Sequence, residues 1–243
     1  MDVKTMDFKK AAALKAVSFL NPGMVIGLGH GSTAIFAVRE IAELICEGVL
    51  KDILGIPCSA QVEQEAHDLG IPLTTLDEHP VIDITIDGAD EVDADLNLIK
   101  GGGGALLREK IVAQASRREI IVVDESKLSG LLGTRWPVPV EVVAFGLQTH
   151  IMHIENLGAM VRIRTGHAGA PFRTDQGNFV LDCDFGPIKD PAKLAGSLKD
   201  HAGIVEHGLF LGMATDVIVS GPAGLRHLAR NDAHQGGTTN DLH

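Results

Sequence analysis

The sequence predicts an α/β protein with a mainly parallel sheet and a second, smaller α+β domain. Three observations lead to this prediction. In the first half of the 243 residues, short apolar strand patterns alternate with helical patterns, which is typical of parallel sheets covered on both faces. Several of these strands run directly into glycine-rich or acidic loops. Beyond residue 131 the glycine loops disappear and a hairpin-type turn occurs at 175–178, which favours an antiparallel sheet.

The first half of the chain supplies the parallel sheet and its helices. Apolar runs predict strands at 24–28, 55–58, 71–73, 81–86 and 119–123. Helical spacing of apolar residues predicts helices at 7–19, 34–46, 59–69 and 105–115. The Asn-Pro-Gly sequence at 21–23 stops the first helix, and Ser59 can cap the third. In such sheets ligands bind where the loops at the carboxyl ends of the strands converge.

The second half predicts the smaller domain and a return to the first sheet. The expected elements are an extended segment at 136–140, helices at 149–157 and 191–199, and strands at 160–164, 179–183 and 204–207. A strand at 213–219 is expected to rejoin the first sheet, followed by a short helix at 224–229. The polar residues 231–243 are expected to form a disordered tail.

Composition excludes several classes of function. The formal charge is −11, which argues against nucleic acid or an anionic membrane as a partner but permits a small phosphate ligand. The chain contains no run of 18 apolar residues, so no membrane span is expected. The charged N-terminal helix is not expected to be a secretory signal. The three cysteines, Cys46, Cys58 and Cys183, are odd in number and far apart, which favours a reducing cytoplasm over a disulfide framework.

Residues 87–110 concentrate the chemistry of the chain. Asp87 and Asp90 are three residues apart, so both can face one pocket across the tight turn of Gly88 and Ala89. Neighbouring acids can hold different protonation states, which acid–base chemistry uses. A metal site in this acidic loop and a merely solvated loop are the alternatives, although the spacing does not fit an EF-hand.

Lys100 and the four glycines that follow it resemble a site for a developing negative charge. A lysine beside bare backbone N–H groups can stabilise an oxyanion. Glu109 lies near the start of the next predicted helix, where the helix dipole is expected to hold it ionised and suited to act as a base. The alternative for Glu109 is a surface ion pair with Arg108 or Lys110.

Two further loops can reach the same crevice. Gly29-His30-Gly31-Ser32-Thr33 stands between a predicted strand and a helix, which is how a helix N-terminus is presented to a phosphate. Its spacing is not the dinucleotide-binding GxGxxG, and a plain strand–helix turn is the alternative. Lys127 follows the strand at 119–123 and is either a ligand of the crevice or a solvated loop lysine.

These motifs together resemble the ribose-5-phosphate isomerase A family. The resemblance is carried, in order, by GLGHGSTA (27–34), TIDGADEVD (85–93), LIKGGGGALLREKIVA (98–113) and VVDESKL (122–128). The family implies a Rossmann-like catalytic domain with an inserted ferredoxin-like α+β domain. The implied limits are residues 1–132 plus 207–230 for the catalytic domain, 133–206 for the smaller domain and 231–243 for the tail.

The resemblance also implies an activity. Members interconvert D-ribose 5-phosphate and D-ribulose 5-phosphate through an enediolate, in the non-oxidative pentose phosphate pathway, without metal or organic cofactor. A homodimer or homotetramer is implied. Two alternatives remain: a non-catalytic sugar-phosphate sensor, and a sugar-phosphate deaminase or coenzyme A transferase-like enzyme. The spacing from Lys100 to Glu109 disfavours the second, and the lack of a basic helix-turn-helix segment disfavours the first.

Family roles fall on particular residues of this chain. Glu109 matches the glutamate that moves a proton between C2 and C1, Asp87 the acid associated with ring opening, and Lys100 the residue that stabilises the enediolate. The remaining substrate-binding positions are implied to be His30, Gly31, Ser32, Thr33, Gly88, Ala89, Asp90, Gly101, Gly102, Gly103 and Lys127. His30 is a departure, because the family usually has Thr there; we expect it to contribute its backbone to ligand binding.

Overall fold

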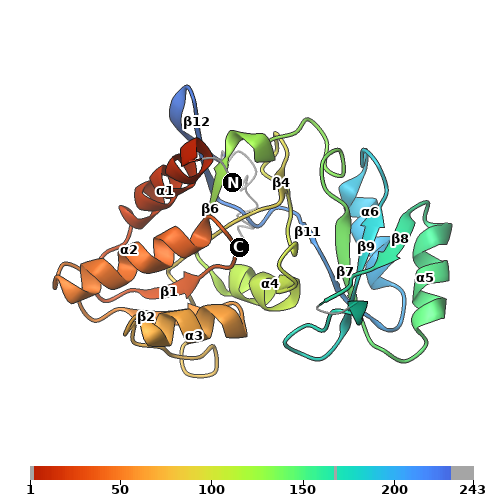
Figure 1. Cartoon of the computed structure of the whole chain (residues 1–243), viewed down its shortest axis with the longest axis horizontal. Coiled ribbons are helices and arrows are strands. Elements are labelled where there is room, and N and C mark those ends of the chain that lie inside the picture. The colour runs from red at the N-terminus through yellow and green to blue at the C-terminus, as the bar shows by residue number, and fades with distance from the viewer. Residues whose placement is uncertain (1–2, 167–168, 231–243) are drawn as a thin grey trace, which may run out of the picture.

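The computed structural model describes residues 3–166 and 169–230, so the expected tail at 231–243 lies outside the described residues. Its centre is a six-stranded sheet (Figure 1). In spatial order the strands are β13 (Gly224–Ala229), β12 (Asp216–Gly221), β6 (Glu119–Asp124), β3 (Ile84–Asp87), β1 (Val25–Leu28) and β2 (Leu54–Pro57). All neighbours are parallel except β12 and β13. The predicted α/β class with a mainly parallel sheet is therefore confirmed.

Helices cover both faces of this sheet. They are α1 (Val3–Val17), α2 (Ala34–Cys46), α3 (Ala60–Asp68) and α4 (Leu106–Ala115), and the 3₁₀ turn η1 (Glu125–Lys127) follows β6 directly. Side chains of α1, α2 and α3 share one apolar cluster with alternate residues of β1, β3 and β6. Residues of α4 pack instead with the opposite side of the strands. None of the helices in the described part of the chain has the length and apolar character that crossing a membrane requires.

Glycines bring the ends of β1 and β3 unusually close. A Cβ on Gly27 would lie 1.8 Å from Thr85 Oγ1, and one on Gly29 would lie 2.4 Å from Asp87 Cα. No side chain fits at such distances, so glycine permits the approach. The loop after β1 and the loop after β3 consequently meet at one edge of the sheet, as the sequence predicted.

A four-stranded antiparallel sheet lies to one side of the central sheet (Figure 1). Its order is β10 (Ile204–His207), β7 (Val138–Val142), β9 (Phe179–Asp184) and β8 (Met160–Ile163), with α5 (Leu147–Asn156) and α6 (Pro191–Lys199) packed on it around a separate apolar core. This confirms the smaller antiparallel domain. The predicted turn is also present, because Thr174 N–H donates to Asn178 O at 3.0 Å and Gly177 has a φ of 78°.

A small third sheet, which the sequence did not reveal, links the two parts. It consists of β11 (Leu209–Phe210), β5 (Leu98–Ile99) and β4 (Glu91–Val92) in antiparallel order. Each of its strands has two residues, too few to show an alternating pattern. Lys100 follows β5 directly, and its N–H donates to Gly208 O at 2.9 Å. The segment returning from the smaller domain thereby holds the chain beside the site.

Two predicted elements are wrong. Residues 224–229 form strand β13, paired antiparallel with β12, rather than a helix; this edge strand is largely exposed, so burial gives it no alternating pattern. Residues 71–73 form only an isolated bridge between Leu73 and Gly55 rather than a strand. Ile71-Pro72 interrupts the run with a residue that lacks an N–H donor.

Candidate active site

A buried ammonium group forms the centre of the candidate site. Lys100 Nζ lies 3.0 Å from Asp87 Oδ2 and 3.0 Å from Glu109 Oε1, and it donates to Gly88 O at 2.5 Å. The side chains of these three charged residues are at most 4% exposed. Asp87 ends β3, Lys100 follows β5 and Glu109 lies in the first turn of α4. Three elements within one stretch of the chain therefore meet at the predicted residues.

The two carboxylates keep Lys100 charged. Burial lowers the pKa of this lysine, but Asp87 and Glu109 outweigh burial and raise the pKa above its ordinary value. Asp87 is in turn fixed through Oδ1, which accepts from the N–H groups of His30 at 2.9 Å and Gly88 at 2.7 Å. Lys100 is thus a permanent cation at neutral pH.

Glu109 differs from the expectation that the helix end would hold it ionised. Burial raises the pKa of Glu109 to about 7, against the opposing effect of Lys100. One carboxylate oxygen, Oε1, is bound to Lys100, whereas Oε2 has no hydrogen-bond partner in the described part of the structure. A carboxylate that takes up and releases a proton near neutral pH, with one oxygen unused, suits proton transfer.

A cavity of about 310 Å³ opens above these groups. Its lining residues are His30, Gly31, Ser32, Thr33, Gly88, Ala89, Asp90, Lys100, Gly101, Gly102, Gly103, Glu109, Lys127 and Trp136. The prediction that Asp87 and Asp90 face one pocket is wrong in part, because Asp87 is completely buried beneath Lys100 and only Asp90 reaches the lining. Trp136 was not predicted; its ring centroid lies 5.1 Å from Lys127 Nζ.

The glycine run is held by contacts from several segments. Gly102 N–H donates to Asp90 Oδ2 at 2.7 Å. A Cβ on Gly103 would lie 2.3 Å from His30 Nε2, and one on Gly104 would lie 2.4 Å from the ring of Phe172. Gly104 also has a φ of 83°, in the region that favours glycine. These contacts require glycine and bring the backbone directly to the cavity wall.

The loop after β1 presents hydroxyls to the cavity. Thr33 stands at the N-cap of α2, and its hydroxyl makes no capping bond. Ser32 Oγ accepts from Lys9 Nζ at 2.7 Å. Lys9, on α1, was missed because a lysine on an amphipathic helix carries no signal of a site. The expected backbone role of His30 is not supported, since its N–H is taken by Asp87 and its ring Nδ1 lies 2.9 Å from Ser59 Oγ.

The buried groups do not suit a metal ion. Ligand atoms of Cys58, Asp87 and Glu109 lie within 4.8 Å of one another. Burial and the negative charge of Asp87 raise the pKa of the Cys58 thiol well above its ordinary value, so the thiolate that metals prefer is disfavoured. Lys100 already supplies the positive charge that both carboxylates contact. The arrangement of base, cation and backbone donors fits proton abstraction beside a carbonyl group.

The chain is similar to proteins of one family. Residues 54–224 match the family model for ribose 5-phosphate isomerase A (phosphoriboisomerase A). A ribose-5-phosphate isomerase A of Chloroflexus aurantiacus is 57% identical over 96% of this chain and 98% of its own length. One from Desulfatibacillum aliphaticivorans is 58% identical over 90% of this chain and 96% of its own length.

Solved structures agree with these sequence matches. A D-ribose-5-phosphate isomerase in complex with phospho-erythronic acid superposes with a TM-score of 0.91, at 39% identity over 95% of this chain and all of that one. The ribose 5-phosphate isomerase of Plasmodium falciparum gives a TM-score of 0.89, at 42% identity over 92% of this chain and 98% of that one.

Proposed function

The chain belongs to the ribose 5-phosphate isomerase A family, and we propose that the cavity above Lys100 is where it interconverts D-ribose 5-phosphate and D-ribulose 5-phosphate. The activity itself follows from the family. We further propose which residue carries out each step. The observation that carries it is the buried Glu109 carboxylate at the cavity wall, with one oxygen on Lys100 and the other unpartnered within the described structure.

Glu109 is the proton carrier. Its Oε2 removes the proton from C2 of the open-chain aldose, and the electron pair forms the C1–C2 double bond while the C1 carbonyl electrons move onto O1. The hydroxyl proton of O2 passes to O1, and the same carboxyl group returns the C2 proton to C1, so that C2 becomes the carbonyl carbon of the ketose. A pKa of about 7 makes both transfers accessible at neutral pH. Lys100 stabilises the enediolate oxygens, because it is a cation at the cavity wall whose position is fixed by two carboxylates.

Asp87 and Asp90 have separate roles in ring opening. Asp87 does not reach the cavity, so it acts through Lys100, which it holds charged and in place. Asp90 lines the cavity and is the carboxylate that meets the sugar hydroxyl as the furanose opens. One of its oxygens also fixes the Gly102 N–H, so ring opening and the glycine run are supported by the same side chain.

The phosphate group is held at the other end of the cavity. Ser32, Thr33 and Lys127 line it, and Lys9 contacts Ser32. Two ammonium groups, two hydroxyls and the start of α2 form a set of donors that favours a dianion. This binding would place the sugar chain toward Glu109.

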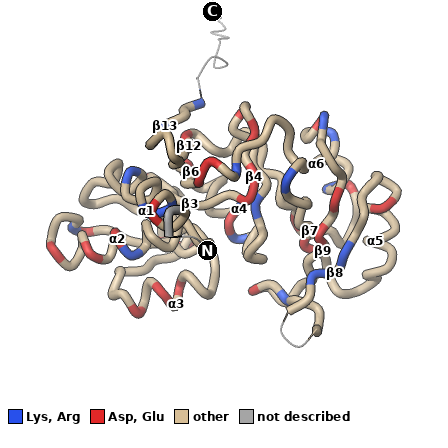
Figure 2. Tube along the Cα trace, turned by 45° about the horizontal axis from the view of Figure 1, so that its top comes forward, with Lys and Arg blue, Asp and Glu red and all other residues tan. Residues whose placement is uncertain are grey.

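The proposal also includes the domain limits, the assembly and the cellular setting of the protein. We take residues 1–132 plus 207–230 as the catalytic domain and 133–206 as the smaller domain, and we propose a homodimer or homotetramer. Acidic and basic residues are interspersed along the chain (Figure 2), and the net charge is −11, which supports a small-molecule substrate rather than nucleic acid. The three cysteines are free, which supports a reducing, cytoplasmic setting. The pentose phosphate pathway is the expected context.

The test is isomerisation of ribose 5-phosphate in the presence of EDTA by the parent protein and by Glu109→Gln. The variant keeps the shape of the side chain but removes its basicity, so turnover is expected to fall at least about 100-fold. Binding, followed by the fluorescence of the single tryptophan, Trp136, is expected to persist. A parent that binds the sugar phosphate without converting it would favour the sensor alternative, and a fully active variant would exclude Glu109 as the base.

A further inference from the structure

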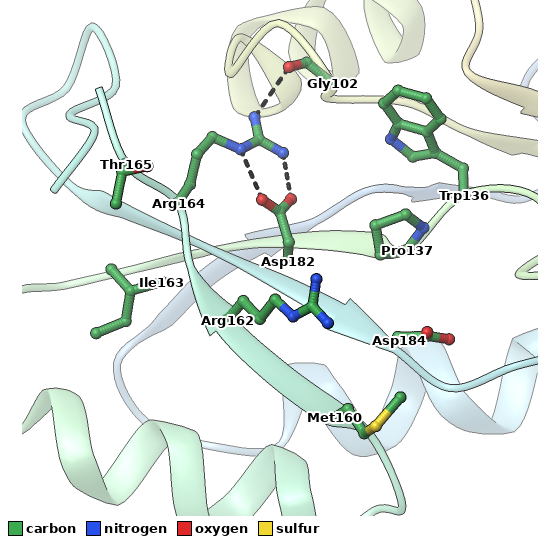
Figure 3. Close-up of a pocket in the computed structure, with 10 residues that line it drawn as sticks. All are labelled: Gly102, Trp136, Pro137, Met160, Arg162, Ile163, Arg164, Thr165, Asp182 and Asp184. Atoms are coloured by element: carbon green, nitrogen blue, oxygen red, sulfur yellow. Dashed lines mark hydrogen bonds and ion pairs between the residues drawn. The ribbon is translucent and has the colours of Figure 1, made fainter. Parts of the chain in front are cut away.

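Arg164 connects the smaller domain to the glycine run of the active site. It follows β8 and lies in a second cavity of about 520 Å³ beside the first; Gly102 and Trp136 line both cavities (Figure 3). The Arg164 side chain is only 14% exposed. Arg164 was not predicted from the sequence, because nothing near it resembles a catalytic motif.

Every arm of the Arg164 guanidinium is used. Nη1 donates to Gly101 O at 2.7 Å and to Gly102 O at 3.1 Å. Nε donates to Asp182 Oδ2 at 3.1 Å, and Nη2 donates to Asp182 Oδ1, so the carboxylate of β9 braces the arginine from the other side (Figure 3). The backbone N–H of Arg164 also donates to Val180 O at 2.9 Å. The guanidinium is therefore a rigid link between β9 and two successive peptide groups.

Fixing these two carbonyls also fixes the N–H groups that follow them. In a trans peptide the C=O and the next N–H point in opposite directions. With the carbonyls of Gly101 and Gly102 turned toward Arg164, the N–H groups of Gly102 and Gly103 are turned away from it. Gly102 N–H accordingly reaches Asp90 on the cavity side. Gly103 N–H has no acceptor among residues 3–166 and 169–230, and Gly103 lines the cavity.

We propose that Arg164, held by Asp182, is a positioning residue that aims the Gly103 N–H at the enediolate. This inference rests on the proposed function of the cavity. The N–H then acts together with Lys100, one as a neutral directed donor and the other as a cation. Without Arg164 the Gly101–Gly103 peptides keep only the contact of Gly102 N–H with Asp90 and that of Gly104 N–H with Gly101 O, and glycine itself gives little resistance to rotation. Loss of Arg164 should therefore destabilise the charged intermediate and leave substrate binding largely unchanged.

Arg162 provides a matched control. It lies two residues earlier on β8, so it faces the same side of the strand, and it lines the same cavity (Figure 3). Its guanidinium makes no hydrogen bond or ion pair with any residue that the structure describes. Arg162→Met therefore removes the same charge from the same cavity without releasing the glycine run.

The experiment compares Arg164→Met, Arg164→Lys, Asp182→Asn and Arg162→Met. For Arg164→Met we expect kcat to fall about 10- to 100-fold, somewhat less than for loss of a whole oxyanion donor, with KM within about threefold. Affinity for phospho-erythronic acid, whose carboxylate offers a planar pair of oxygens, should fall by a similar factor, measured by Trp136 fluorescence. Lys and Asn variants should lie between, and Arg162→Met should match the parent.

Amide hydrogen exchange adds a readout that does not depend on turnover. Exchange in the Gly101–Gly104 peptide should accelerate in Arg164→Met and not in Arg162→Met. Parental kcat and parental inhibitor affinity in a folded Arg164→Met protein would overturn the proposal. If that variant does not fold, Asp182→Asn with unchanged kcat and exchange would overturn it instead. A parent protein inactive on ribose 5-phosphate would refute the proposed function. The exchange result would still test whether Arg164 holds the Gly101–Gly104 backbone in place.

Discussion

Two buried lysine clusters meet at the ring of Phe210 and differ in one decisive respect. Lys100 Nζ lies 5.5 Å and Lys110 Nζ 4.8 Å from that ring centroid. Lys110 is saturated: it donates to Glu206 Oε1 at 2.8 Å, His207 O at 2.6 Å and Leu209 O at 2.9 Å. The Lys100 cluster instead leaves Glu109 Oε2 without a partner in the described structure.

The pKa values follow this difference. Around Lys110, burial lowers the pKa of the lysine to about 8, and the pKa of Glu206 lies well below its usual range, because Lys110 and Lys199 outweigh the effect of its burial. Around Lys100, burial raises the pKa of Glu109 to about 7. The carboxylate of the Lys110 cluster, Glu206, is therefore ionised throughout the neutral range, whereas Glu109 in the Lys100 cluster can take up and release a proton there. Glu109 and Lys110 are sequence neighbours, so one helix, α4, serves both a reactive and a structural cluster.

Removing Lys100 should produce the largest effect. Lys100→Met deletes the cation that faces the enediolate and leaves Asp87 and Glu109 buried beside each other. We expect kcat to fall about 1,000-fold, the upper end for loss of an oxyanion-stabilising group. Steady-state kinetics on ribose 5-phosphate checks this, with circular dichroism confirming the fold. If Lys100→Met kept more than a tenth of the parental turnover, the proposed difference between the two clusters would be contradicted.

The same change in the other cluster should affect stability instead. Lys110→Met leaves Glu206 and two buried carbonyls short of a donor, so we expect about 3 kcal/mol of destabilisation, measured by urea unfolding, with kcat within about threefold of the parent. Lys199→Met is the control: Lys199 also pairs with Glu206 but its side chain is 50% exposed, and about 0.5 kcal/mol is expected. If Lys110→Met lowered kcat by more than about threefold and left the free energy of unfolding unchanged, the assignment of Lys110 to a structural cluster would be contradicted.

Lowering the pH should also distinguish the two clusters, with a smaller effect on kcat than the substitution of Lys100. Glu109 is active when deprotonated, and its raised pKa means that protons occupy it as the pH falls below about 7. We expect kcat at saturating substrate to drop about tenfold per pH unit in the acid limb. Glu206, whose pKa is lowered, stays ionised in this range. A Glu206→Gln profile should therefore keep the limb, and a flat parental profile down to pH 5 would refute the role of Glu109.

The smallest effect is expected at His30. Its ring packs against Gly103 and lies 2.9 Å from Ser59 Oγ, so His30→Thr should raise KM about threefold and cost about 1 kcal/mol through a lost hydrogen bond and contact. His67→Thr, at a histidine side chain that is 79% exposed, is the control in the same assays. Identical kinetic constants for His30→Thr and the parent would show that the imidazole has no part in function.

The site residues that could be predicted from the sequence are those that lie together in one contiguous motif. Glu109, Lys100 and Asp90 were identified because acids, lysine and glycines occur together within 24 residues, and the structure brings them to one cavity. The sequence also placed Asp87 in the cluster, but not behind Lys100, because the order of layers within a site depends on how β3 and β5 pack. Local spacing contains no information about that packing.

What the sequence missed comes from distant segments. Lys9 reaches Ser32 across 23 residues, and Arg164 reaches Gly101 across 63. Neither side chain belongs to a recognisable pattern in its own neighbourhood. The two-residue strands β4, β5 and β11 were missed for the same reason, because their pairing depends on the return of the chain from the smaller domain. The misassigned strand β13 is defined by its partner β12 rather than by burial.

The contacts of the glycine run also have an evolutionary consequence. Gly103 meets the ring of His30, and Gly104 meets the ring of Phe172. A side chain gained at either glycine would need space given up first at a position about 70 residues away along the chain. Lineages in which residue 103 gains a side chain should therefore also have a smaller residue at 30, and those in which residue 104 gains one should have a smaller residue at 172.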